Sequence, residues 1–401
     1  MEIGFSYREH KEVQNTIMFL QSYNISTNMA LNIYNIYREK TTAIVKNNPY
    51  KLLEDIDGIG FTTADKIAKN VGIPENSEFR VRAGLVHVLK VSCEKNGNTY
   101  LPKNALYGEA SKALGLLEEE NKELFDRTFD TLCLDKTCVT LWQDNVEIVM
   151  LSKYYYYENS IAQKLTWLKN ASKSAKFDID EDISAFQLKN KIQLHEEQIN
   201  AIKGAVNNGV FVITGGPGTG KTTIIKCILE IFENMQKKVA LVAPTGRASK
   251  RMSDSTKHEA KTIHRLLEVN VIKSSESYFL HNETNPLNVD VVIVDEVSMV
   301  DCALMCNLLK ALPRDCKLVL VGDKDQLPSV GPGNVLADIL GSGVIPFCML
   351  TKIFRQGEKS LIITNAHLIN EGKMPLIDNT SMDFFFESKG DPESIKDTII
   401  N

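Results

Sequence analysis

The sequence predicts an α/β protein: a parallel β-sheet flanked by helices, preceded by a mostly helical region. Three features of the chain support this class. After residue 185, short β-branched runs alternate with helical stretches, and a glycine-rich turn joins the first run to a helix. Before about residue 170, apolar residues recur at helical spacing. Near-continuous apolar strands separated by helices are typical of a sheet covered on both faces.

Length and composition indicate an ordinary soluble protein of two or three domains. The chain has 401 residues, of which 43% are hydrophobic and 24% charged. Its net charge of −5 excludes a strongly basic protein, so any contact with nucleic acid must come from local surfaces. Residues Met1–Gly4 do not open a signal peptide, and no run approaches the roughly 20 apolar residues of a membrane helix. We therefore expect a cytoplasmic protein with no membrane partner.

The eight cysteines show no Cys-x-x-Cys pair and no zinc spacing. Cys302, Cys306 and Cys316 lie close together in sequence, so an iron–sulfur site is one interpretation. A fourth ligand is not apparent, and free cysteine packs well as a small core residue. We therefore favour reduced thiols in an intracellular protein.

The helical region contains one prominent turn. Gly58-Ile59-Gly60 precedes a helical run over Thr62–Asn70, which a second glycine turn ends. Further on, Tyr154–Tyr157 lead into another helix; they fit core packing, with stacking on bases as the alternative. The polar segment Ala171–Asp182 has the composition of a linker between this region and the α/β part.

The strongest motif is a phosphate-binding loop, G-x-x-x-x-G-K-[ST], at Gly215–Thr222. An apolar run, Val210–Thr214, precedes it and a helical stretch follows, as the motif requires. Backbone N–H groups and the start of the helix would cradle phosphates, Lys221 would reach the β- and γ-phosphates, and the hydroxyl of Thr222 would bind Mg²⁺. The predicted nucleotide-binding residues are Gly216, Pro217, Gly218, Thr219, Gly220, Lys221, Thr222 and Thr223.

Two further strands end in polar residues that suit the same site. An apolar run ends in Asp295-Glu296, where Asp295 would hold Mg²⁺ and Glu296 would orient and deprotonate water. Adjacent strand residues point to opposite faces, so these roles require the strand to have ended before the pair. The run Lys317–Val321 leads to Gln326, which would contact the γ-phosphate; a polar turn is the alternative. Lys221, Glu296 and Gln326 are thus candidate catalytic residues.

Taken together, these motifs resemble superfamily 1B DNA helicases of the RecD/TraA type, with specific motifs from about Leu194 to Gln356. The resemblance implies a RecA-like P-loop NTPase domain with a parallel sheet, preceded by a helix-hairpin-helix region. It implies that Gln198 contacts adenine and that Arg355 reaches the γ-phosphate as a further catalytic residue. It also implies ATP and Mg²⁺ as cofactors.

The same resemblance implies contacts with DNA. Pro244, Thr245 and Arg247 match one motif that contacts single-stranded DNA, and Thr262 and His264 match the next. The insertion at about residues 268–286 would carry a pin that splits the duplex, with a surface loop as the alternative. At the Gly-Ile-Gly turn, the backbone amides of Gly58 and Gly60 would approach a DNA phosphate, and Lys66, one turn into the next helix, would add positive charge; a pure helix-packing turn is the alternative.

The resemblance divides the chain into four parts. These are a helix-hairpin-helix region at 1–75, a helical connecting domain and linker at 76–184, a first motor domain at 185–345, and an incomplete second motor domain at 346–401. Asp383–Phe386 is similar to the first strand of that second domain. The family's later motifs V and VI, and a small β-barrel that precedes its hairpins, have no counterpart here, so the chain is expected to be cut at both ends.

The implied function is an ATP-dependent DNA helicase or translocase that moves 5′ to 3′ on single-stranded DNA and acts at duplex junctions. This chain alone is not expected to unwind DNA completely. One alternative is a P-loop ATPase of another class. The other is a DNA-binding module that binds nucleotide without turnover. Protein partners cannot be inferred from these motifs.

Overall fold

The computed structural model describes residues 2–56, 58–171, 177–270, 278–354, 360–377, 379 and 383–400. The chain forms two compact units, Met1–Tyr157 and Glu158–Asn401. Helix α9 (Ser152–Ala171) begins in the first unit and continues into the second. No helix in these described ranges combines the length and apolarity needed to span a membrane.

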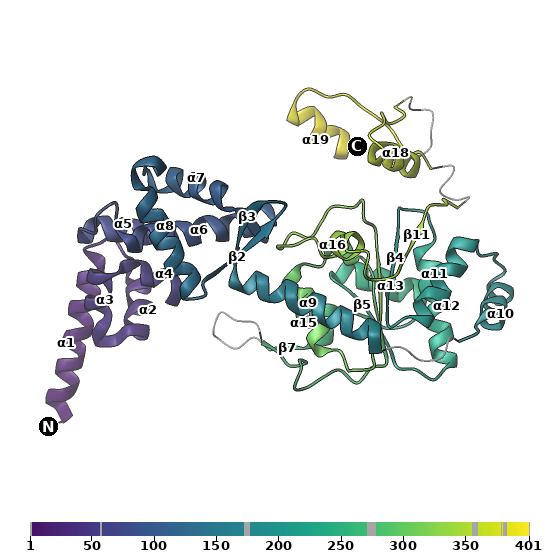
Figure 1. The fold of residues 1–401 in the computed structure, drawn as a ribbon, viewed down its shortest axis with the longest axis horizontal. Helices are drawn as coiled ribbons and strands as arrows, with labels where there is room; N and C mark the ends of the chain where they lie inside the picture. Colours follow the sequence, from purple (N-terminus) through teal and green to yellow (C-terminus); the bar gives the residue numbers. More distant parts are fainter. Residues whose placement is uncertain are drawn as a thin grey trace. The chain divides into compact units, whose positions relative to one another are not determined.

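Unit 1 is mostly helical, as predicted (Figure 1). Its helices are α1 (Glu2–Gln21), α2 (Thr27–Tyr37), η1 (Arg38–Lys40), α3 (Thr41–Asn47), η2 (Pro49–Lys51), α4 (Leu52–Asp55), α5 (Phe61–Val71), α6 (Glu78–Asn96), α7 (Lys103–Leu114) and α8 (Glu118–Leu134). Buried side chains from α1 through the start of α9 form one continuous core. The predicted boundary near residue 75 therefore does not coincide with the division into compact units at 157/158.

A three-stranded antiparallel sheet in unit 1 was not among the predicted elements. It consists of β1 (Tyr100–Pro102), β2 (Cys138–Gln143) and β3 (Val146–Leu151), in the order β1-β3-β2. Asp144 and Asn145, with φ of 48° and 64°, form the two-residue turn between β2 and β3. Such turns need two residues that tolerate positive φ, which Asp and Asn do. This dipeptide between β-branched runs was the available sequence indication.

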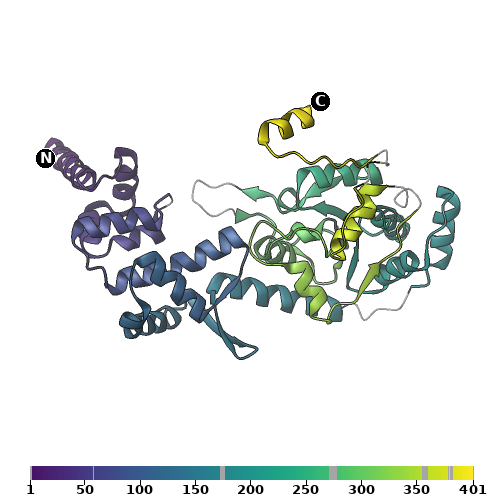
Figure 2. The same cartoon turned by 90° about the horizontal axis from the view of Figure 1, so that it is seen from above.

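Unit 2 is built on a six-stranded parallel sheet, which confirms the predicted class (Figures 1 and 2). Its order is β11-β4-β10-β9-β5-β6, and every neighbouring pair is parallel. The strands are β4 (Val210–Gly215), β5 (Val239–Ala243), β6 (Ala260–Thr262), β9 (Val291–Val294), β10 (Lys317–Gly322) and β11 (Phe347–Leu350). The four predicted runs correspond to β4, β5, β9 and β10.

Both faces of this sheet are buried. Alternate residues such as Ile213, Ile293 and Val319 pack with the helices of one core, while Val212 and Val292 on the other face have no exposed area. This burial explains why the central strands β4, β5, β9 and β10 are apolar at most positions. The helices of unit 2 are α10 (Asp180–Asn190), α11 (Glu196–Asn207), α12 (Lys221–Asn234), α13 (Gly246–Thr256), α14 (Ile263–Leu267), η3 (Val297–Met299), α15 (Cys302–Ala311), α16 (Val335–Gly341), α18 (Leu361–Asn370) and α19 (Pro392–Ile400).

Two predicted features of unit 2 can be compared with the structure. The insertion begins and ends in an antiparallel ribbon of β7 (Val269–Asn270) and β8 (Tyr278–Phe279), and residues 271–277 lie outside the described ranges. The predicted strand at Asp383–Phe386 does not form: these four residues have no strand assignment. Phe386 instead exchanges both backbone hydrogen bonds with the side chain of Asn379, so its N–H and C=O are already satisfied.

A largely buried ion pair between α5 and α6, with its hydrogen bonds to η2 and α7, ties together four elements of unit 1. Arg80 on α6 is 3% exposed, and its Nε and Nη2 donate to Asp65 at 2.7 and 3.2 Å. Tyr50 donates to the same carboxylate at 2.6 Å, and Arg80 Nη1 donates to the carbonyls of Glu75 and Leu114. Burial opposes ionisation of Asp65, but the hydrogen bonds from Arg80 and Tyr50 outweigh it and hold its pKa below its usual range.

Replacing Arg80 should strongly destabilise unit 1. Arg80→Met leaves the Asp65 carboxylate buried without its main partner, which should lower the free energy of unfolding by about 3–5 kcal/mol. Urea denaturation followed by circular dichroism measures this. Because the pKa of Asp65 is lowered in the folded state, its contribution is present above about pH 4 and is lost as pH falls through the folded value. The difference in the free energy of unfolding between Arg80→Met and the wild type should therefore become smaller below about pH 4.

Lys69→Ala is the matched control, since Lys69 is half exposed and lies 3.7 Å from the same carboxylate. It should change the stability by less than about 1 kcal/mol. Equal losses from the two variants would contradict a dominant role for Arg80.

Candidate nucleotide and DNA site

The predicted site residues of unit 2 gather at one edge of the parallel sheet. The phosphate loop follows β4, Gln326 follows β10, and Asp295-Glu296 follow β9. The DNA motifs follow β5 and β6, where Ala243 and Thr262 are paired neighbours. Because all six strands are parallel, their carboxyl ends share one edge. The edge therefore runs from nucleotide motifs to DNA motifs without interruption.

The phosphate loop has the strand–loop–helix form that the sequence predicts. Its residues Gly216–Gly220 connect β4 to α12, with φ of +80° at Gly218 and +84° at Gly220. A Cβ on Gly220 would lie 2.3 Å from Nε2 of Gln198. Gly220 is thus required both for its backbone conformation and for the close approach of a side chain.

Lys221 points into its own loop. Its Nζ donates to the carbonyl of Gly215 and, at 3.1 Å, to that of Gly216. Burial lowers the pKa of Lys221, while the charges of Asp323, Glu296 and Asp295 oppose this effect. Glu296 lines the same pocket as the loop residues, so it lies on the same side of the sheet as the loop.

Asp295 and Glu296 lie just beyond the last residue of β9. Glu296 has φ of 55°, a left-handed conformation that is uncommon for glutamate. The turn lets the two side chains take different surroundings: Asp295 is 8% exposed and accepts from the N–H of Glu296 at 3.0 Å, while Glu296 lines the pocket. Burial, followed by the charge of Glu296, raises the pKa of Asp295.

The chemistry of this pair fits a divalent cation. A buried carboxylate beside a second carboxylate is stabilised by positive charge, and Mg²⁺ prefers oxygen ligands with several waters retained. Asp295 would supply such an oxygen, and the exposed hydroxyl of Thr222 at the start of α12 would supply another. These are the two ligands that the sequence predicts.

A pocket of about 630 Å³ lies over the loop. Its wall contains Gly216–Thr223, together with Gln198, Glu296 and Gln326. Phe354 and Ile363, from beyond β11, complete it, and the N–H of Phe354 donates to Gly218 at 3.1 Å. Arg355, the predicted γ-phosphate contact, lies outside the described residues.

Gln198 uses both ends of its amide on the protein itself. Its oxygen accepts from the N–H of His195 at 3.0 Å, and its Nε2 donates to the carbonyl of Thr219 at 3.1 Å. The side chain is 4% exposed. Gln198 therefore braces the phosphate loop against the start of α11, a contact that the expected adenine role did not include.

The neighbouring residue, Glu197, binds the chain that leaves β11. Its carboxylate accepts from the N–H and hydroxyl of Thr351 at 2.8 and 2.6 Å, and from the N–H of Lys352 at 3.3 Å. Burial opposes ionisation, but these hydrogen bonds outweigh it and lower the pKa of Glu197. The first turn of α11 thus contacts the phosphate loop and the β11 exit through consecutive residues.

The predicted DNA contacts of unit 2 combine exposed and structural groups. Arg247 and His264 are exposed, and the ring of His264 lies 5.9 Å from that of Phe279. Thr245 and Thr262 are the N-caps of α13 and α14, where their hydroxyls accept from backbone N–H groups at 3.2 Å. Capping alone accounts for threonine at these two positions.

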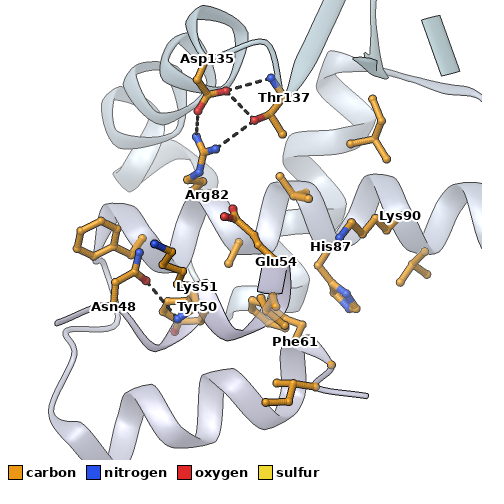
Figure 3. Close-up of a pocket in the computed structure, with 18 of the residues that line it drawn as sticks. Asn48, Tyr50, Lys51, Glu54, Phe61, Arg82, His87, Lys90, Asp135 and Thr137 are labelled. Carbon is orange, nitrogen blue, oxygen red and sulfur yellow. Dashed lines mark hydrogen bonds and ion pairs between the residues drawn. The ribbon is translucent and has the colours of Figure 1, made fainter. Parts of the chain in front are cut away.

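In unit 1, the Gly-Ile-Gly turn borders a cavity of about 1080 Å³ (Figure 3). Gly58, with φ of +87°, and Gly60 line it, whereas Lys66 is exposed on α5 and is not part of the wall. Figure 3 shows Arg82 on one wall held by Asp135 and Thr137. Other lining residues are Lys51, Glu54, Phe61, His87, Lys90, Glu94 and Lys153.

The cavity offers both positive charge and a ring surface. Phe61 and His87 stack with centroids 4.9 Å apart. Lys51, Lys90 and Lys153 are exposed, and within the described ranges none of them forms an ion pair. The predicted hairpin contact therefore adjoins three lysines that sequence reasoning did not single out.

Sequence reasoning also missed Arg251 on α13. Its guanidinium forms a hydrogen bond and an ion pair with Glu296, and it lines the nucleotide pocket. The available indication was its place four residues after Arg247, on the same side of a helix.

Comparison with known proteins accounts for both parts of the chain. A family described as "ATP-dependent RecD2 DNA helicase HHH domain" matches residues 9–100, and one described as "AAA domain" matches residues 198–332. The chain is 32% identical over 340 residues to the ATP-dependent RecD2 DNA helicase of Deinococcus radiodurans, covering 80% of this chain and 45% of the relative. Both parts of the chain are thus similar to RecD-like helicases.

Other RecD-like proteins match a shorter stretch. The RecBCD enzyme subunit RecD of Mycolicibacterium smegmatis is 40% identical over 195 residues, which is 43% of this chain and 35% of that protein. A crystal structure of Pif1 helicase from Candida albicans covers 46% of this chain and 45% of its own, at 26% identity and a TM-score of 0.35. This chain thus spans less than half the length of these RecD-like relatives.

The bracing role of Gln198 can be tested by comparing two nucleotides. Gln198→Ala removes the brace, so the affinities for ATP and GTP should both fall by about threefold to tenfold, as expected for one or two hydrogen bonds. Titration with fluorescent analogues of each nucleotide measures this. Loss of ATP affinity with GTP affinity unchanged would show instead that Gln198 acts by contacting adenine.

Proposed function

We propose that this chain forms the DNA-engaging region and the first motor domain of an ATP-dependent DNA helicase. The observation that carries the proposal is the shared sheet edge, where the nucleotide motifs after β4, β9 and β10 continue into the DNA motifs after β5 and β6. A chemical change at the nucleotide then acts on elements that adjoin the DNA contacts. The curated relative from Deinococcus radiodurans, named as an ATP-dependent DNA helicase, supports the same activity.

In the proposed reaction, the loop amides and Lys221 bind the phosphates of ATP, and Glu296 orients a water molecule. The water oxygen bonds to the γ-phosphorus, the bond from phosphorus to the β–γ bridging oxygen breaks, and the water proton passes to Glu296. ADP and phosphate are the products. Gln326 lines the pocket wall, and we propose that it contacts the γ-phosphate and responds to its loss.

Mg²⁺ would be held by Thr222 and Asp295 and would neutralise charge on the phosphates. The chain's own contribution is to keep Asp295 buried beside Glu296, so that the first acid holds the ion and the second remains at the pocket. We also propose that Arg355 supplies a further positive charge to the γ-phosphate, as the family resemblance implies.

For DNA, we propose contacts in both units. In unit 2, Pro244, Thr245, Arg247, Thr262 and His264 would bind the strand along which the protein moves. In unit 1, the amides of Gly58 and Gly60 would bind phosphates, with the cavity lysines beside them adding charge. Movement from 5′ to 3′, and a pin made by the β7–β8 ribbon, are proposed from the resemblance to superfamily 1B.

ATP hydrolysis with and without single-stranded DNA tests the proposal. Stimulation by an oligonucleotide is expected for a DNA motor. A rate of ATP hydrolysis that single-stranded DNA does not change would indicate a P-loop ATPase of another class. Binding of ATP and of DNA without ATP hydrolysis would indicate a non-enzymatic module.

Two variants should separate nucleotide binding from hydrolysis. Lys221→Ala should abolish nucleotide binding, because it removes the charge that faces the phosphates. Glu296→Gln should bind nucleotide normally but hydrolyse it at least about 100-fold more slowly, the usual range for loss of a general base. Fluorescent-nucleotide titration and phosphate release measure the two effects.

Lys237→Ala is the control. It alters an exposed lysine just before the start of β5, at the opposite edge of the sheet, and should change neither nucleotide binding nor hydrolysis. Unchanged turnover in Glu296→Gln would remove Glu296 from the mechanism.

The cavity of unit 1 makes a separate prediction about DNA. Replacing Lys51, Lys90 and Lys153 together by alanine should weaken DNA binding and reduce the salt slope of log K by about 2–3, because each phosphate contact contributes about 0.7–0.9. Fluorescence anisotropy of a labelled oligonucleotide at several salt concentrations measures both. Lys112→Ala, an exposed lysine paired with Glu109, should leave the slope unchanged. If Lys66→Ala reduces the slope and the triple variant does not, DNA meets the hairpin from α5 rather than from the cavity.

A further inference from the structure

Arg251 joins the DNA side of the sheet edge to the nucleotide side. It lies on α13, which follows β5, and its Nη2 donates to Oε1 of Glu296, which follows β9. β5 and β9 are paired, with Val242 beside Val294. The contact therefore results from the strand order, because α13 follows β5 and Glu296 follows the adjacent strand β9.

The side of α13 that carries Arg251 also carries a proposed DNA contact. Arg247 and Arg251 are four residues apart, so they project from one side of the helix. Both are exposed, while Ala248, Met252 and Thr256 are buried against the rest of unit 2. Four residues of helix rise by about 6 Å, so a strand bound at Arg247 passes within reach of Arg251.

The two partners differ in their freedom to move. The side chain of Arg251 is 66% exposed and that of Glu296 is 15% exposed. The guanidinium can therefore exchange the carboxylate for another anion, and DNA phosphate accepts two parallel hydrogen bonds from arginine. The backbone of Glu296 is held by its left-handed conformation and by the hydrogen bond from its N–H to Asp295.

The contact engages the group on which hydrolysis depends. Glu296 must accept a hydrogen bond from the attacking water through a carboxylate oxygen, and in this structure Oε1 already accepts from Arg251. The carboxylate is also turned toward α13 as long as the pair persists. Releasing Arg251 frees both the oxygen and the orientation of the side chain.

We propose that Arg251 is a positioning residue that holds Glu296 away from the attacking water until a DNA phosphate beside Arg247 draws the guanidinium away. This inference rests on the proposed function, since it requires hydrolysis at Glu296 and DNA at α13. It assigns the DNA dependence of hydrolysis to one contact between the segments that follow two paired strands.

Steady-state ATP hydrolysis by the 401-residue chain, with and without oligothymidine, tests this proposal. Arg251→Ala should raise kcat without DNA by about fivefold, which corresponds to about 1 kcal/mol, the upper range for an exposed ion pair. The KM for ATP and the kcat at saturating DNA should stay within about twofold of wild type. The DNA stimulation ratio should therefore fall about fivefold.

Three further variants make the result specific. Arg251→Lys keeps a charge that can reach Glu296 and should restore a low rate without DNA. Lys250→Ala alters the exposed neighbour, which does not contact Glu296, and should leave the rate without DNA unchanged. Arg251→Ala combined with Glu296→Gln should be as slow as Glu296→Gln alone, because the released rate must pass through that carboxylate.

The outcomes distinguish this inference from the proposed function. If wild type is stimulated by DNA but Arg251→Ala leaves the rate without DNA unchanged, or lowers kcat equally with and without DNA, the inference is wrong and the proposed function stands. If wild-type hydrolysis is not stimulated by DNA, the proposed function fails and the inference fails with it.

Discussion

Parallel pairing of the six central strands is the constraint on which the rest of unit 2 depends. It delivers the carboxyl end of each strand to a single edge, and the order β11-β4-β10-β9-β5-β6 decides which groups become neighbours there. The phosphate loop lies between the exits of β10 and β11, and the acids lie between the exits of β10 and β5. The loop that follows each strand is therefore a neighbour of the loops that follow the adjacent strands, and their side chains can contact one another.

Much of this arrangement follows from local sequence. The phosphate loop needs glycines at fixed positions and a lysine at the start of a helix. Eight consecutive residues are therefore enough to predict it. The four main strands are buried on both faces, which leaves an apolar run that is easily recognised. Asp295 and Glu296 were assigned different roles on condition that the strand ends before them, and β9 does end at Val294.

The remaining features depend on pairings that sequence does not display. Arg251 meets Glu296 only because β5 and β9 are neighbours, although more than thirty residues separate these strands along the chain. Gln198 was assigned to adenine by resemblance, yet its surroundings also include the carbonyl of Thr219. The small sheet of unit 1 was hidden because its turn, Asp144-Asn145, is short and lies among helices. For Arg251 and Gln198, a partner distant in sequence decided the outcome.

The first turn of α11 has a mechanical consequence. Gln198 is fastened to the phosphate loop and Glu197 to the backbone of Thr351 and Lys352, and a helix does not let adjacent residues shift separately. A movement of α11 would therefore displace the phosphate loop and the segment leaving β11 together. Any tilt of α11 when phosphates enter or leave must pull on Thr351, and hence on the chain that continues toward Phe354. A carboxylate outside the pocket thus joins the helix that braces the phosphate loop to the chain that leaves β11.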